Sequence, residues 1–144
     1  MAATDPFQLQ RFIDAQNGIF DQALAELKAG RKQSHWMWFV FPQLAGLGRS
    51  TTAKFYGIRS SEEAQAYLDH HVLGPRLTQA VETAMCWAGK RSAEEIFGSI
   101  DAMKLRSSLT LFSQVAQTEA FRHALAAFFA RPDEQTLALL QQSR

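Results

Sequence analysis

A chain of 144 residues, 47% hydrophobic and 20% charged, can bury one sizeable core and is too apolar to be intrinsically disordered. Its net charge of +1 lacks the global basic field of most nucleic-acid binders, and its apolar runs, such as residues 36–41, are far short of the roughly 20 residues that cross a bilayer. The single Cys86 excludes an internal disulfide, and residues 1–8 lack a signal-peptide pattern, so we expect a cytoplasmic protein with no membrane partner.

Helix signals run along the whole chain. The pair Asp5–Pro6 is typical of a helix start and Gly30 of a helix end, with an interruption near Gly18. Further helix starts are indicated, in chain order, at Ser50 or Thr51, at the capping box Ser60–Glu63, at Pro75, at the capping box Ser92–Glu95, at Ser99, at Thr118 and at about Asp133.

Strand signals are nearly missing from the same chain. No alternating pattern with a hairpin turn occurs, and only residues 39–41, "FVF", could form a short strand. We therefore predict an all-α fold: one irregular multihelical domain over residues 1–144, with about seven or eight helices and little or no sheet.

A segment without acids coincides with the most aromatic part of the chain. Between Glu26 and Glu62 there is no Asp or Glu, while six basic residues occur there: Lys28, Arg31, Lys32, Arg49, Lys54 and Arg59. Two interpretations stay open: a solvated basic edge, or a site for a phosphate-bearing ligand whose ring stacks on Trp36 or Trp38. His35, beside them, could be a polar member of the same pocket.

The turn that follows could hold a phosphate. Gly46 and Gly48 allow unusual backbone shapes, and a helix start at Ser50 or Thr51 would offer free amides and a positive dipole end. Flanking candidates for the same ligand are Gln43, Arg49 and Lys54. The turn is not a P-loop, because Gln43 and Arg49 stand where that motif needs Gly and Lys. An ordinary helix-capping turn is the alternative.

One amphipathic helix carries polar groups in its apolar face. At about 100° per residue, Asp101, Lys104 and Ser108 project into the apolar face, whereas Thr110 and Ser113 fall on the solvent side. A buried unpaired charge costs several kcal/mol, so these groups must pair or line a polar cavity. Either Asp101 and Lys104 form a structural ion pair, or the three residues are catalytic or orienting groups in a pocket wall.

Neither a metal nor a cofactor is predicted. His70 and His71 are adjacent and so point in different directions, and no Cys/His spacing is typical of zinc.

Three motifs carry a family resemblance: "RKQSHWMWFVFPQLAGLGRSTTAKFYGI", "VLGPRL" and "FGSIDAMKLRSSLTLF". Through them, from about residue 7 to residue 140, the chain resembles the bacterial domain-of-unknown-function family 1810, sometimes labelled calpastatin. The resemblance implies a small all-helical domain and no particular activity.

A fainter similarity concerns the ADP-ribose-associated N-glycosidases, a family related to a riboflavin-pathway glycosidase. The order of "FVF", "AKFY", "DAMKLRSSLTLF" and "TEAFRHAL" is similar to that family. The similarity implies that Asp101 is the functional aspartate and that Trp36 or Trp38 stacks on the base. Residues 50–52 are Ser-Thr-Thr where that family carries an acid, and Ala102 stands where it carries Trp.

Together these observations lead to two functional expectations. The first is a pocket for an anionic small molecule of nucleotide or ADP-ribose type, with N-glycosidase-like hydrolysis in which Asp101 stabilises the sugar cation or activates water. The alternative is a non-enzymatic domain that contacts protein or RNA through a basic face. The oligomeric state is left open.

Overall fold

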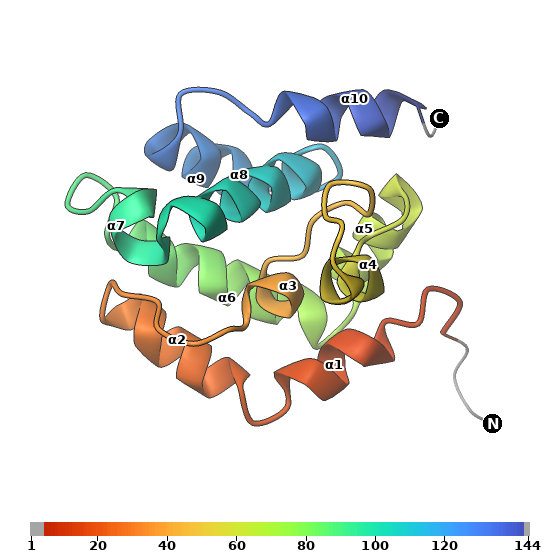
Figure 1. Ribbon diagram of the computed structural model, residues 1–144, viewed down its shortest axis with the longest axis horizontal. Helices are drawn as coiled ribbons and strands as arrows, with labels where there is room; N and C mark the ends of the chain where they lie inside the picture. Colours follow the sequence, from red (N-terminus) through yellow and green to blue (C-terminus); the bar gives the residue numbers. More distant parts are fainter. Residues whose placement is uncertain (1–4, 143–144) are drawn as a thin grey trace.

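The computed structural model describes residues 5–142, and this part of the chain contains ten helices rather than the seven or eight expected (Figure 1). Their bounds are α1 (Gln10–Gln16), α2 (Phe20–Lys28), α3 (Met37–Val40), α4 (Thr51–Tyr56), α5 (Ser61–Asp69), α6 (Leu73–Met85), α7 (Ala93–Phe97), α8 (Ser99–Ser113), α9 (Ala120–Phe128) and α10 (Glu134–Gln142).

The additional helices arise where local signals were too short to resolve. Gly18, with a φ of +78°, separates α1 from α2 at the expected interruption. The aromatic run, where "FVF" could have formed a strand, instead forms the single turn of α3. Extended pairing within residues 5–142 is limited to one isolated parallel bridge between Leu44 and Ile58, so the all-α prediction is confirmed.

The two predicted capping boxes turn out differently. Ser92 forms the complete box at the start of α7. Ser60 caps α5 through its hydroxyl, but the carboxylate of Glu63 turns away from the Ser60 amide. It accepts instead from the amide of Arg59 at 3.0 Å and pairs with the guanidinium of Arg11 at 2.7 Å. The long-range ion pair with Arg11 therefore replaces the local hydrogen bond from the Ser60 amide.

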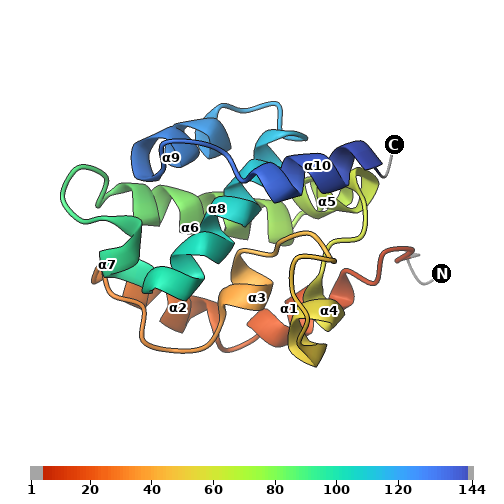
Figure 2. The same ribbon diagram turned by 45° about the horizontal axis from the view of Figure 1, so that its top comes forward.

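Helix α8 is the central element of the molecule. It packs against α3, α5, α7, α9 and α10, and both ribbon views place it between α3 and the two C-terminal helices (Figures 1 and 2). Every side chain from Ser107 to Ser113 is buried, including those of Thr110 and Ser113, which were expected to face solvent. The reason is that the segment before α10 covers that side, where the Asp133 amide donates to the Thr110 hydroxyl at 2.8 Å.

None of the helices described between residues 5 and 142 combines the length and the apolar character needed to cross a membrane.

Candidate functional site

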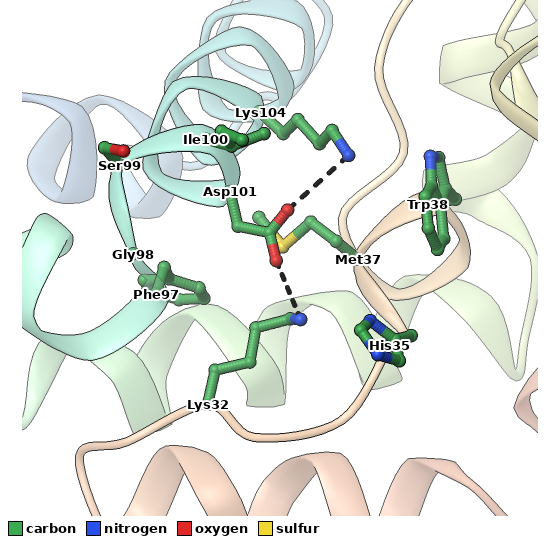
Figure 3. Close-up of a pocket in the computed structure, with 10 residues that line it drawn as sticks. All are labelled: Lys32, His35, Met37, Trp38, Phe97, Gly98, Ser99, Ile100, Asp101 and Lys104. Atoms are coloured by element: carbon green, nitrogen blue, oxygen red, sulfur yellow. Dashed lines mark ion pairs between the residues drawn. The ribbon is translucent and has the colours of Figure 1, made fainter. Parts of the chain in front are cut away.

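A cavity of about 350 Å³ opens where the start of α8 faces the loop between α2 and α3 (Figure 3). One wall comes from the end of α7 and the first turns of α8, and the other comes from the loop and α3. The lining residues are Lys32, His35, Met37, Trp38, Phe97, Gly98, Ser99, Ile100, Asp101 and Lys104.

Gly98 shapes the α8 wall. It is the N-cap of α8 and has a φ of +83°, a conformation that favours glycine. Within residues 5–142 no side chain caps this helix start, and the positive end of the α8 dipole lies at residues that line the cavity. Asp101 lies in the first turn of α8, where that dipole favours a carboxylate. Ile100 is 72% exposed at the rim.

The carboxylate of Glu26, near the end of α2, holds the loop wall. It accepts from the amides of Gln33 (2.7 Å) and Ser34 (2.9 Å), from the Ser34 hydroxyl (2.6 Å) and from the Trp36 indole nitrogen (3.0 Å). Burial alone would raise the pKa of Glu26, but these hydrogen bonds outweigh it and lower the pKa to about 2. Glu26 is therefore ionised at neutral pH and fixes the backbone that carries Lys32 and His35.

Asp101 bridges two lysines across the cavity. Its Oδ2 lies 2.7 Å from Nζ of Lys32, and its Oδ1 lies 3.5 Å from Nζ of Lys104 (Figure 3). The Lys104 ammonium also lies 4.5 Å from the centre of the Trp38 ring, a cation–π contact. Two ammonium groups against one carboxylate leave the cavity with a formal surplus of one positive charge.

Four predicted site residues meet in this cavity, although they come from distant parts of the chain. His35 and Trp38 line one wall, and Asp101 and Lys104 line the other. Ser108, the third catalytic candidate predicted on α8, is 1% exposed and does not line the cavity. Its Oγ has no hydrogen-bond partner in the described part of the chain. The structure thus separates Ser108 from the other two catalytic candidates.

Trp36, the other stacking candidate, does not line the cavity. Trp36 is fully buried, and its ring packs against Phe41 and Phe97. Its indole N–H is bonded to Glu26. The structure places Trp36 in the core, so Trp38 alone of the pair presents an indole to the cavity.

The predicted phosphate turn lies apart from Asp101. Arg49, Ser50, Thr51 and Lys54 are exposed and do not line the cavity. The Ser50 hydroxyl accepts from the amide of Ala53 at 3.0 Å and so caps α4, which agrees with the alternative of an ordinary capping turn. Gln43 is nearer: it lines a recess of about 10 Å³ together with Trp38 and Lys104.

Six of the lining residues were not predicted from the sequence: Lys32, Met37, Phe97, Gly98, Ser99 and Ile100. Lys32 was recognised only as one of six bases in the acid-free segment. The sequence did contain a signal for this pair. A base in the acid-free segment has no nearby acid along the chain, and the buried Asp101 needed a basic partner. The two halves of the pair are 69 residues apart, so only the fold joins them.

The chemistry available in the cavity is that of anion and ring binding. It offers ammonium groups, a carboxylate, an imidazole and one indole. No three side chains of His, Cys, Asp or Glu within residues 5–142 gather so that they could hold a metal ion.

Comparison with known proteins places the chain in a context without an assigned activity. A model of the family described as "Protein of unknown function (DUF1810)" matches residues 6–140. The crystal structure of the conserved hypothetical protein Rv1873 from Mycobacterium tuberculosis is similar, with a TM-score of 0.92 and 50% sequence identity over 95% of this chain and 99% of that one. No curated protein matches the chain.

Proposed function

Because this chain belongs to the DUF1810 family, whose description assigns no activity, we propose its function from the cavity alone: it binds an anionic small molecule that carries a flat ring, of the nucleotide or ADP-ribose type. The observation that carries the proposal is the Lys32–Asp101–Lys104 bridge beside the Trp38 indole. It combines surplus positive charge for a phosphate with an aromatic surface for a base. A volume of about 350 Å³ lies within the range of small-molecule sites.

We further propose that Asp101 acts on an N-glycosidic bond of such a ligand. In that reaction the bond between the sugar carbon and the base nitrogen breaks, and its electron pair leaves with the base. Water adds to the sugar carbon, one of its protons passes to the departing base, and the products are the free base and the sugar with a new hydroxyl. A carboxylate beside the sugar would stabilise the cationic transition state or accept the proton of the attacking water.

The arrangement of the basic residues gives less support to the alternative of a protein- or RNA-binding face. Lys32 is withdrawn into the ion pair with Asp101. The turn after α2, which carries Arg31, and helix α4, which carries Lys54, lie toward opposite ends of the molecule in both ribbon views (Figures 1 and 2). The elements that carry Arg31 and Lys54 are therefore well separated, and the ammonium of Lys32 is already paired with Asp101.

The test of the proposal is ligand binding followed by turnover. Thermal shift and calorimetry with AMP, ADP-ribose, adenosine and adenine should show tighter binding of the phosphate-bearing compounds than of the other two, and Trp38→Ala should weaken binding. Phe55→Ala is the matched control, because Phe55 is an aromatic residue 55% exposed outside the cavity. Chromatography would then detect free base, and Asp101→Asn should abolish its release while a urea titration confirms that the variant is folded. Wild-type protein that binds none of the four compounds would refute the proposal.

A further inference from the structure

The two lysines that contact Asp101 are not equivalent, and Lys32 is the one whose ammonium is already occupied. Its Nζ lies 2.7 Å from Asp101 Oδ2, donates to the carbonyl of Ser34, and lies 4.9 Å from the centre of the Trp36 ring. The side chain is only 6% exposed, and the backbone N–H donates to the Ile96 carbonyl at 2.7 Å. An ammonium has three donors, of which Asp101 and the Ser34 carbonyl take two, so the buried side chain of Lys32 has little capacity left for a ligand.

Lys104 is held much more loosely. Its Nζ lies 3.5 Å from Asp101 Oδ1, beyond the roughly 2.7–3.2 Å of an N–H···O hydrogen bond. The side chain is 23% exposed, and its other contact is the face of Trp38. Its N–H donors are therefore available to a group that enters the cavity. Asp101 Oδ1 is correspondingly the less engaged of the two carboxylate oxygens, because Oδ2 lies 2.7 Å from Nζ of Lys32 (Figure 3).

We propose that Lys104 is the specificity residue that binds the phosphate of the ligand, whereas Lys32 is a positioning residue that fixes Asp101 with Oδ1 toward the sugar. This assignment rests on the proposed function and narrows its ligand class. The Lys104 ammonium contacts both the carboxylate and the indole ring. A phosphate on Lys104 therefore places the attached ring near Trp38 and the sugar near Oδ1. That geometry fits a nucleoside monophosphate, whose single phosphate also matches the small charge surplus.

The experiment compares AMP with adenosine, which differ only in the phosphate. Isothermal titration of the wild type should show tighter binding of AMP. Lys104→Met should lower AMP affinity roughly ten- to hundred-fold, the usual range for one hydrogen bond to a charged group, and change adenosine affinity far less. Lys32→Met should weaken AMP and adenosine by the same factor. Lys90→Met, at an exposed lysine that does not line this cavity, should change neither.

A double-mutant cycle separates positioning from a general effect on folding. If Lys32 acts through Asp101, Lys32→Met should have no further effect on adenosine affinity in the Asp101→Asn background, whereas Lys104→Met should still remove the preference for AMP. A Lys32→Met effect of equal size in both backgrounds would refute the positioning role. Retention of the AMP preference by Lys104→Met would refute the assignment of Lys104 while leaving the pocket intact. A wild type that binds neither compound would refute the proposed function itself.

Discussion

Replacement of Glu26 by Gln should destabilise the protein more than its place near the end of a short helix suggests. The carboxylate accepts hydrogen bonds from two amides of the loop, from the Ser34 hydroxyl and from the Trp36 indole. A glutamine keeps one oxygen acceptor but directs an NH₂ group toward donors. At least one of those donors would lose its acceptor, and the loop that carries Lys32 and His35 would lose its anchor.

The magnitude follows from the pKa. A shift from 4.5 to about 2 corresponds to about 3–4 kcal/mol at neutral pH, at about 1.4 kcal/mol per pKa unit. This range is an upper bound for the charge itself, because the residue keeps some contact with solvent. If the glutamine side chain leaves a buried donor without an acceptor, the loss of stability increases by about 1–3 kcal/mol. We expect Glu26→Gln to lower the free energy of unfolding by roughly 2–4 kcal/mol at about pH 7.

The pH dependence provides an internal check. Because the folded pKa lies below the unfolded one, the wild type has this stability above pH 4.5 and loses it as the pH falls toward 2. Gln does not titrate, so the difference between the two proteins in urea titrations should shrink across that window. Glu82→Gln, at an exposed position on α6, should stay within about 0.5 kcal/mol of the wild type. A Glu26→Gln effect below about 1 kcal/mol at neutral pH, or one that is constant with pH, would contradict this reasoning.

Two further predictions concern other parts of the fold. Arg11→Met should cost about 3–5 kcal/mol in urea unfolding, because it leaves the carboxylate of Glu63, 2% exposed, without its ion partner. The double variant Arg11→Met/Glu63→Met should recover part of that loss, and a double variant as unstable as the sum of the two singles would contradict the pairing. The Nδ1 of His70 accepts from the amides of Val72 (3.1 Å) and Leu73 (3.3 Å), and burial, aided by a second His beside it, lowers the pKa of His70 below 6.5. The neutral ring therefore stabilises the fold above pH 6.5, and this contribution should disappear as the pH falls through 6.5 and then through the lowered folded pKa. His70→Asn keeps an acceptor that does not titrate, so the variant should lose less unfolding free energy than the wild type between about pH 8 and about pH 5. Equal losses of unfolding free energy in the two proteins would refute the role of His70.

Local features of the sequence predicted much of the helical content. The Ser92 capping box lies where it was expected, and Gly18 interrupts the first helical segment. These signals act between residues no more than four apart, so they do not depend on the rest of the chain. The count of helices was wrong mainly because α3 is a single turn, too short to show a period.

The sequence also indicated that Asp101 and Lys104 share one face of α8, and both line the cavity. The same helical periodicity predicted that Thr110 faces solvent, yet Thr110 is fully buried. A helix covered by neighbours on all sides has no solvent face, and periodicity alone does not reveal how many neighbours it has.

By itself, then, the sequence determined an all-α chain with an acid-free aromatic segment and an acid inside an apolar helix face. Only the tertiary structure decided which residues meet. It paired Lys32 with Asp101, placed Trp36 in the core and Trp38 at the cavity, and kept Ser50 away from Asp101. The physical reason is that helix periods and caps depend on neighbours along the chain, whereas a site depends on contacts between distant segments that only packing selects.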